Sequence, residues 1–277
     1  MAKKLLPLVT AAAMIVGLAT AAPSAEKTDK KRLLVVTHTA GFRHDSIPMA
    51  EQVLKELGEK SGVYTADFCR NADEVKQMMT VKNLGKYDGV IFANTTGDLG
   101  MPDFDGFLRW LRGGKAFIGA HSAADTYRPG QFNGDRRFIE MLGGEFLTHG
   151  AQCTVNCIVD DPAHSAVNHL GEVWTIHDEI YILANNSREN VRVLLSLNAY
   201  PPDGSAHAGQ PGDHLIAWVK RYGLGRVFYT ALGHRIDVWE NPQFQEHMLG
   251  GIKWSLGLAS GSAVPRNPQP KPAALAK

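Results

Sequence analysis

The residue with the strongest chemical signal is His121. The segment 115–126 reads KAFIGAHSAADT, and its apolar residues 116–118 are typical of a buried strand. Small residues flank the histidine on both sides, which is typical of a sharp strand-to-helix turn, where a larger side chain would collide with neighbouring backbone. Hydrolases use such a turn to expose a Ser or Cys nucleophile. We therefore expect His121 to be presented for chemistry, with the alternative that it only caps the next helix.

Further polar side chains follow two other apolar segments that we expect to be strands, at 32–37 and 88–93. In an open parallel sheet the ligand lies outside the carboxyl ends of the strands, where the strand order reverses. These strand ends and the histidine turn should therefore share one crevice. The candidate residues in it are His44, Arg43, Thr96, Asp98, His121, Ser122 and Asp125. The structural alternatives are a turn residue for His44, a surface charge for Arg43 and an Asx turn for Asp98.

Two later segments also carry groups suited to acid–base chemistry. His234 closely follows the apolar segment 226–231, which makes it a second candidate for catalysis. The triplet 177–179, His-Asp-Glu, combines an imidazole with two carboxylates, and this set suits either acid–base catalysis or metal binding. We assign Glu179 to the site and expect the other carboxylate to face solvent.

A divalent metal is an alternative to purely acid–base chemistry. Imidazole and carboxylate together suit Zn, Mn or Fe, and His121, His149 and His177 could supply the imidazoles. No HxxxH or HExxH spacing marks such a site, and His149 reads equally well as a core residue. A metal cofactor is therefore an open expectation, and no other cofactor is indicated.

The elements that must position these residues alternate between strand and helix in the first half of the chain. Strands that are apolar throughout are typical of a sheet covered on both faces, so this sheet should be parallel and doubly wound, with right-handed crossovers. The expected strands are 32–37, 63–69, 88–93, 116–118, 191–197, 214–219 and 226–231, with strand-like segments at 144–161 and 173–183; the expected helices are 47–61 after an N-cap at Ser46, 73–79, 104–112, 135–142 and 242–256 after an N-cap at Asn241. The fold class is α/β, with a flavodoxin-like, mostly parallel sheet and added antiparallel strands.

The two ends of the chain differ in composition from the middle. Residues 1–25 begin with two lysines near the start, continue with a weakly apolar run and end in small residues. This pattern predicts a signal peptide and an exported, periplasmic or secreted protein, because the run is short for a membrane span. Residues 258–277 are rich in Pro, Ala and Lys and should be disordered, which leaves one domain at 26–257.

The composition argues against two classes of protein. The formal net charge is +1 and the sequence has no basic stripe, which argues against a nucleic-acid surface. Three cysteines are too few for a disulfide framework, and Cys153 and Cys157 lie four apart in a strand, too far to bridge. We interpret both, and Cys69, as buried small apolar residues.

Several motifs, taken in order, resemble the ThuA-like (trehalose utilisation) family. They are THTAGFRH, GAHSAADT, GGEFLTHG, HDEIY and IAWVKRYGLGRVFYTALGH, followed by Trp239 and Trp254, and the resemblance covers residues 33–257. It implies a class I glutamine amidotransferase-like fold and a role in carbohydrate utilisation, near oxidised (3-keto) sugars and disaccharides. The family carries His at the turn where true amidotransferases carry Cys, and His121 agrees. Because a neutral imidazole cannot form and release the thioester, we do not expect a glutaminase.

Two functions from different classes fit these residues. In the first, a sugar or keto-sugar binds at the sheet edge, and His121 with His234 or Glu179 performs acid–base catalysis of an isomerisation, elimination or hydrolysis, with His44 nearby. The expected sugar-binding residues are Arg43, Thr96, Asp98, Ser122, Asp125, Tyr181 and Trp239, of which the last two would stack on the sugar. The second function is a non-catalytic sugar-binding or partner-binding domain derived from an amidotransferase fold.

Overall fold

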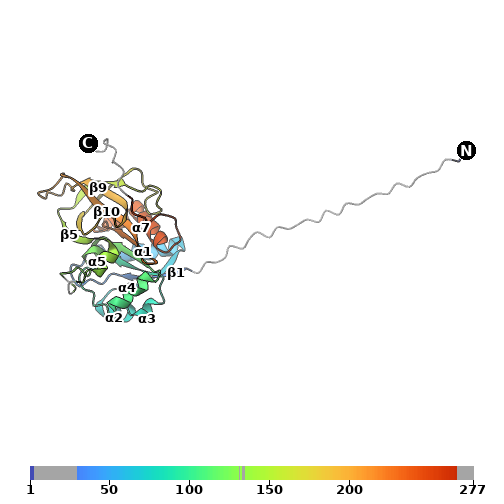
Figure 1. Cartoon of the computed structure of the whole chain (residues 1–277), viewed down its shortest axis with the longest axis horizontal. Helices are drawn as coiled ribbons and strands as arrows, with labels where there is room; N and C mark the ends of the chain where they lie inside the picture. The colour runs from blue at the N-terminus through green and yellow to red at the C-terminus, as the bar shows by residue number, and fades with distance from the viewer. Residues whose placement is uncertain (3–29, 131, 133–134, 267–277) are drawn as a thin grey trace.

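Five parallel strands form one half of the central sheet. In the computed structural model (Figure 1), which describes residues 1–2, 30–130, 132 and 135–266, they lie in the order β2-β1-β3-β4-β11. Their bounds are Lys31–Val36 for β1, Tyr64–Cys69 for β2, Gly89–Ala93 for β3, Ala116–Ala120 for β4 and Gly225–Thr230 for β11. Every residue of β3 and β4 is buried, because helices cover both faces of this half.

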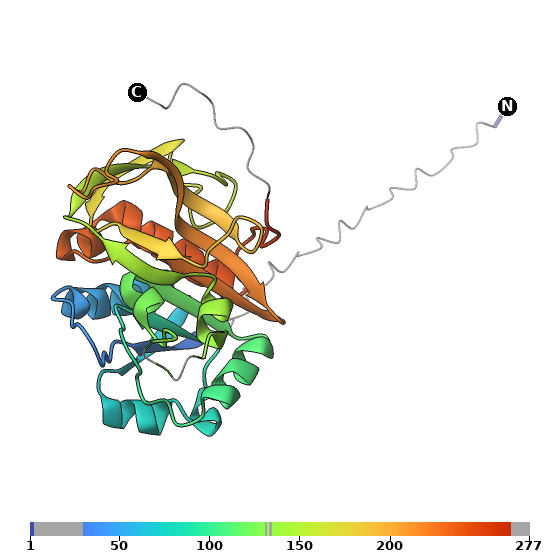
Figure 2. The ribbon, with the colours of Figure 1, turned by 60° about the vertical axis from the view of Figure 1, so that its left-hand side comes forward.

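Antiparallel strands extend the sheet beyond β11. They are β10 (Pro211–Tyr222), β9 (Arg192–Ala199), β6 (Cys153–Val159) and β7 (Val173–Asp178), in that order. The strands β5 (Glu145–His149) and β8 (Tyr181–Ala184) pair with each other in a separate small sheet. Figure 2 shows these yellow to orange strands gathered at one end of the molecule, with the parallel half at the other.

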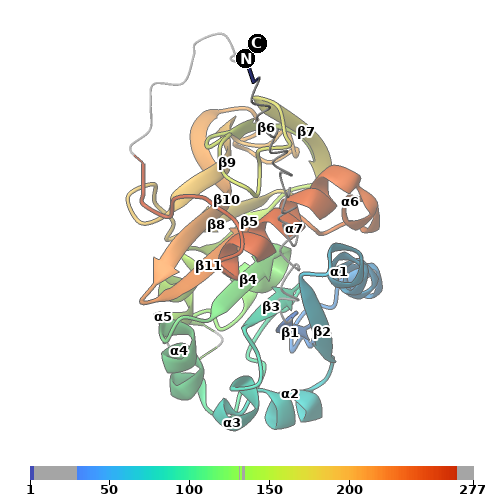
Figure 3. The ribbon, with the colours of Figure 1, turned by 90° about the vertical axis from the view of Figure 1, so that its right-hand side faces the viewer.

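Helices on the two faces of the parallel half enclose two apolar cores. One face carries α1 (Ile47–Ser61), α6 (Ile236–Glu240) and α7 (Pro242–Ser255). The other carries α2 (Ala72–Met78), α3 (Val81–Leu84), α4 (Phe104–Arg112) and α5 (Arg137–Leu142), as Figure 3 shows. Successive residues of β1 alternate between the two cores, as the pleat of a strand requires.

The expected fold class is confirmed, and the structure differs from the sequence prediction in detail. The strand-like segments 144–161 and 173–183 are each split into two strands that belong to different sheets, with breaks at 150–152 and 179–180. The short helices α3 and α6 were not expected. Asn241 caps α7 as predicted, whereas Ser46 stands at the N-cap of α1 without a capping hydrogen bond, because its hydroxyl faces the carbonyl of Gly233.

The chain ends agree only in part with expectation. The predicted signal peptide, residues 1–25, lies outside the described residues except for 1–2, as does the end of the predicted tail. Within residues 258–266 the carbonyl of Gly261 accepts from Trp254 Nε1 at 2.9 Å, and the prediction of a disordered tail from residue 258 stays a prediction. Among the described helices, none has the length and apolar character that a membrane span requires.

We predict that Gly119→Ala destabilises the fold through the strand that leads to His121. A Cβ at this position would lie 3.0 Å from the Tyr229 ring and 3.2 Å from the Ala123 Cβ, so the turn after β4 must shift. We expect a loss of about 1–3 kcal/mol in the free energy of unfolding, measured by urea titration. The control is Gly171→Ala, where the nearest atom is 4.0 Å away. Equal stability of the two variants would contradict the packing argument.

Candidate active site

His121 lies at the end of β4, where the chain turns sharply. Its backbone is in the left-handed region, with φ 48°, and the 3₁₀ helix η1 (His121–Asp125) begins at this residue. The Tyr229 hydroxyl donates to the His121 carbonyl at 2.8 Å and holds the turn. The ring is fixed as well: Nδ1 lies 2.8 Å from the carbonyl of Ala231, which can only accept, so Nδ1 carries the proton. Nε2 therefore faces the other side chains, where it can either bind a cation or carry a second proton.

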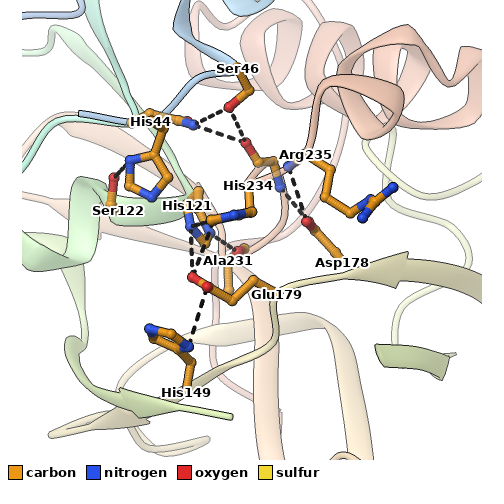
Figure 4. A network of polar contacts seen from close by, with 12 residues as sticks. His44, Ser46, His121, Ser122, His149, Asp178, Glu179, Ala231, His234 and Arg235 are labelled. Atoms are coloured by element: carbon orange, nitrogen blue, oxygen red, sulfur yellow. Dashed lines mark hydrogen bonds and ion pairs between the residues drawn. The ribbon is translucent and has the colours of Figure 1, made fainter. Parts of the chain in front are cut away.

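Three other side chains bring ligand atoms to the same point. His44 comes from the loop between β1 and α1, Glu179 from the turn between β7 and β8, and His234 from the loop between β11 and α6 (Figure 4). One ligand atom from each, with one from His121, lies within 4.8 Å of all the others. His121 Nε2, His234 Nδ1 and Glu179 Oε2 form a triangle with sides of 3.3, 3.2 and 3.5 Å. We call these four residues the histidine cluster.

A divalent metal ion fits the histidine cluster. An ion with bonds of about 2.1 Å keeps neighbouring ligand atoms about 3–3.4 Å apart, close to the sides of the triangle, and the ligand atom of His44 lies within 4.8 Å of the other three. Three imidazoles and one carboxylate are a ligand set that Zn, Mn and Fe accept. The convergence also needs a positive charge, because buried nitrogen lone pairs that face one another repel unless a proton or a cation lies between them.

Burial and mutual contact shift the ionisation of the cluster. Burial raises the pKa of Glu179, but hydrogen bonds and charge attraction from His121 and His234 outweigh it and hold this pKa well below its usual range. Burial lowers the pKa of His234, but its hydrogen bond to Glu179 outweighs that effect, and the net shift is upward. Burial, helped by the two neighbouring imidazoles, lowers the pKa of His44 to about 3. Glu179 is thus the anion of the cluster, and His44 is neutral.

The loop that carries His234 is held by buried polar groups. The Asp178 carboxylate accepts the backbone N–H of Gly233 at 2.7 Å, and the Gly233 carbonyl accepts from Trp239 Nε1 at 2.8 Å and from Asn94 Nδ2 at 2.9 Å. Gly233 has φ 118°, a conformation that favours glycine. The position of His234 therefore depends on residues that lie behind it, outside the cluster.

His149, at the end of β5, contacts the second oxygen of Glu179. Its Nδ1 lies 3.2 Å from Glu179 Oε1 and 2.9 Å from the carbonyl of Gly150. Both neighbours are acceptors, so Nδ1 carries the proton and Nε2 is free to accept one. The His149 side chain is 42% exposed, whereas that of Glu179 is 10% exposed. His149 can therefore exchange protons with a bound ligand or with solvent.

The structure brings together the four residues that the sequence assigned to catalysis, His44, His121, Glu179 and His234. Their catalytic roles remain predictions. Ser122 lies beside them, with its hydroxyl 3.5 Å from His44 Nδ1. Tyr181 is also close, but it is buried and its ring packs on that of His121 with centroids 4.1 Å apart. Tyr181 thus supports the imidazole and offers no free face for a sugar.

Other predicted residues lie away from the cluster. Trp239 is fully buried, so the prediction that it stacks on a sugar is wrong. His177 was expected to join a metal site, but it stands on the exposed side of β7, with Nδ1 3.0 Å from the Thr154 hydroxyl. Of the expected trio of His121, His149 and His177, only His121 belongs to the histidine cluster, and metal binding by any of them stays a prediction. Arg43 is exposed on the loop before His44.

Three further candidates make internal contacts at the crevice. The Thr96 hydroxyl bonds the backbone of residues 41–42, which fixes the loop before His44. Asp98 accepts the N–H two residues further on at 2.9 Å, so its alternative as an Asx turn is the observed one. Asp125 forms an ion pair with Arg128 at 2.7 Å. These contacts shape the loops around the cluster, and a role in sugar binding remains a prediction.

Asp178 was expected to face solvent, and this is wrong, because its side chain is fully buried. Neither Gly233 nor Tyr229 was identified from the sequence. The alternation in β7 carries a signal for Asp178, because it falls in phase with the buried residues Trp174 and Ile176. A carboxylate in such a position must be hydrogen-bonded, which marks it as structurally important. Gly233 and Tyr229 act through partners distant in the sequence, and no local pattern indicates them.

No thiolate is available at the turn. Cys69, Cys153 and Cys157 are free and buried, as interpreted from the sequence. Burial raises the pKa of all three thiols, to about 12 for Cys69 and Cys157 and to about 11 for Cys153. His121 occupies the position that holds the Ser or Cys nucleophile in the strand-to-helix turns of hydrolases.

Comparisons with known proteins agree with this architecture. The family model ThuA, described as trehalose utilisation, matches residues 32–255. A ThuA-like protein from Parabacteroides merdae is 18% identical, with a TM-score of 0.67 over 84% of this chain and 93% of that one. One from Bacteroides uniformis is 22% identical, with a TM-score of 0.65 over 86% and 95%. At these identities the structures support the fold alone. A search of curated proteins found no match.

We predict that Tyr229→Phe loosens the turn at His121 while leaving the core packed. The change removes the hydroxyl that donates to the buried His121 carbonyl. Loss of a buried hydrogen-bond partner should lower the free energy of unfolding by about 1–3 kcal/mol, measured by urea titration. Stability within error of the wild type would show that the hydroxyl does not hold this turn.

Proposed function

The chain belongs to the ThuA family, described as trehalose utilisation, and we propose that it is a metal-dependent enzyme that acts on a sugar. One observation carries the proposal: three imidazoles and a carboxylate from four separate loops place ligand atoms within 4.8 Å of one another in a buried position. Proteins rarely bury several imidazole nitrogens and a carboxylate face to face unless a cation or a reaction requires them. We assign His44, His121, His234 and Glu179 as the ligands of a divalent transition metal.

The fixed proton on His121 Nδ1 supports this assignment. Metal-binding histidines commonly donate their second ring nitrogen to a carbonyl or carboxylate, and the Ala231 carbonyl has that role here. When bound, the ion would act as a Lewis acid that polarises a carbonyl or hydroxyl oxygen of the sugar. His44 is neutral at physiological pH because its pKa is about 3, so it is ready to ligate without losing a proton.

His149 is the residue best placed to move a proton. Glu179 orients it through Nδ1 and leaves Nε2 free, as a carboxylate orients a catalytic imidazole in hydrolases. We propose that His149 removes a proton from the carbon next to a carbonyl of an oxidised sugar, which leads to isomerisation or to elimination of the group on the neighbouring carbon. The departing group takes up a proton, so that no oxidant or reductant is needed.

The same proposal includes export from the cytoplasm. It rests on the composition of residues 1–25, where a positive start, an apolar run and small residues follow one another. The enzyme would then meet its sugar in the periplasm or outside the cell.

We predict that purified protein binds Zn²⁺ or Mn²⁺ in a ratio of about one per chain, since three imidazoles and one carboxylate suit both ions. His121→Ala should reduce the affinity by more than the roughly 10–100-fold that loss of an outer-shell partner costs. The metal content is measured by elemental analysis. The affinity is measured by calorimetric titration of the metal into protein from which a chelator has removed it. The control is His177→Ala, which changes an exposed imidazole close to Glu179 in sequence. Equal metal content in both variants would exclude this centre.

We further predict turnover on a panel of disaccharides, including trehalose, and their 3-keto derivatives, with the metal-loaded protein. His149→Gln should lower kcat by about 10²–10⁴-fold, because general base catalysis contributes that much, while the metal content stays unchanged. His177→Gln is the matched control and should retain the wild-type rate. Binding of sugars without turnover would favour the non-catalytic sugar-binding domain.

A further inference from the structure

A cleft of about 390 Å³ lies beside the histidine cluster, within the size range of small-molecule sites. Residues from three separate segments line it: Phe42, Asp45 and Ser46 before α1, Gln152 from the turn between β5 and β6, and His234, Arg235, Ile236, Asp237 and Glu240 at α6. His234 belongs both to the cleft and to the cluster. A molecule that fills the cleft can therefore contact the histidine cluster through the imidazole of His234.

The cleft contains an aromatic ring with a free face. Phe42 is 67% exposed, although it lies edge-on against the His44 ring with centroids 4.8 Å apart. An exposed phenylalanine leaves a large apolar area in water, and stacking against the C–H face of a sugar ring would cover it. The aromatic residues first expected to stack, Tyr181 and Trp239, are both buried. Phe42 is thus the exposed ring that lines the cleft.

Polar groups in the cleft are already arranged by one another. Arg235 donates to both carboxylate oxygens of Asp237, at 2.8 and 2.9 Å, and to Gln152 Oε1 at 2.5 Å. This array ties α6 to the turn before β6 and presents donors and acceptors side by side, as sugar hydroxyls require. Asp45 adds a further carboxylate acceptor.

The charge of the lining selects against anions. Three carboxylates, from Asp45, Asp237 and Glu240, accompany the single guanidinium of Arg235, which is already paired with Asp237. Away from His234 and the metal beside it, a phosphorylated sugar would meet net negative charge and no free cation among the lining residues, whereas a neutral sugar would not.

We propose that this cleft is the sugar-binding subsite of the enzyme and that it takes a neutral, unphosphorylated saccharide. Phe42 stacks on one ring, while Asp45 and the Gln152–Arg235–Asp237 array hold hydroxyl groups. One end of the saccharide then lies at His234, next to the metal centre. This inference rests on the proposed function, because it assigns the substrate class of the same site.

The experiment compares wild type, Phe42→Ala and Leu224→Ala, all metal-loaded. Leu224 is a matched control because it is 75% exposed, in the turn between β10 and β11. The readouts are metal content, calorimetric binding of trehalose, 3-ketotrehalose and trehalose 6-phosphate, and KM for any member of the disaccharide panel that is turned over. We expect Phe42→Ala to weaken sugar binding or raise KM about tenfold, with metal content unchanged, and Leu224→Ala to match the wild type.

The outcomes separate the two proposals. Wild-type protein that binds no neutral sugar of the panel overturns the proposed function and the subsite with it. Sugar binding that Phe42→Ala leaves unchanged overturns the subsite alone, and so does binding of trehalose 6-phosphate as tight as that of the neutral sugars. Loss of sugar binding in Phe42→Ala with intact metal content supports the subsite, and Phe42→Trp should then restore binding.

Discussion

The site depends on the contact of Glu179 with the imidazoles on both sides of it. One carboxylate oxygen faces His121 and His234, and the other faces His149. A buried carboxylate is stable as an anion only if hydrogen bonds or charges replace its lost hydration, and here the imidazoles do so. The same carboxylate therefore gives the cluster its negative charge, aligns three rings, and joins a buried centre to the exposed His149.

The two halves of the sheet contribute different parts of this arrangement. The parallel half supplies His44, His121 and His234 from strand ends that meet at one edge, as the topology of an open parallel sheet dictates. The antiparallel extension supplies Glu179, from the break between β7 and β8, and the small sheet supplies His149. A parallel sheet alone would thus hold imidazoles without the carboxylate. The added strands therefore complete the histidine cluster.

The sequence predicted the parts of this site that follow from local patterns. Apolar strands with polar ends placed His44, His121 and His234 at one edge, and the small residues around His121 indicated the turn that φ 48° confirms. Whether His177 or Glu179 faces the histidine cluster depends on the side of β7 on which His177 lies and on the break at 179–180. A sequence segment that alternates without interruption does not reveal that break. Trp239 lies in α6, a helix that the sequence did not indicate, and its Nε1 donates to the carbonyl of Gly233. Its burial therefore could not be predicted from the sequence.

Hydrogen bonds from residues outside the histidine cluster explain how the fold maintains its geometry. A histidine in the left-handed region costs about 1–3 kcal/mol, and buried imidazoles add a desolvation cost. The structure opposes these costs with backbone contacts that take no part in the chemistry: Tyr229 on the His121 carbonyl, and Asp178 on the N–H of Gly233. Both partners are buried in the sheet or at its edge, where packing fixes them. The backbone that carries the histidine cluster is therefore held by contacts from residues outside the cluster.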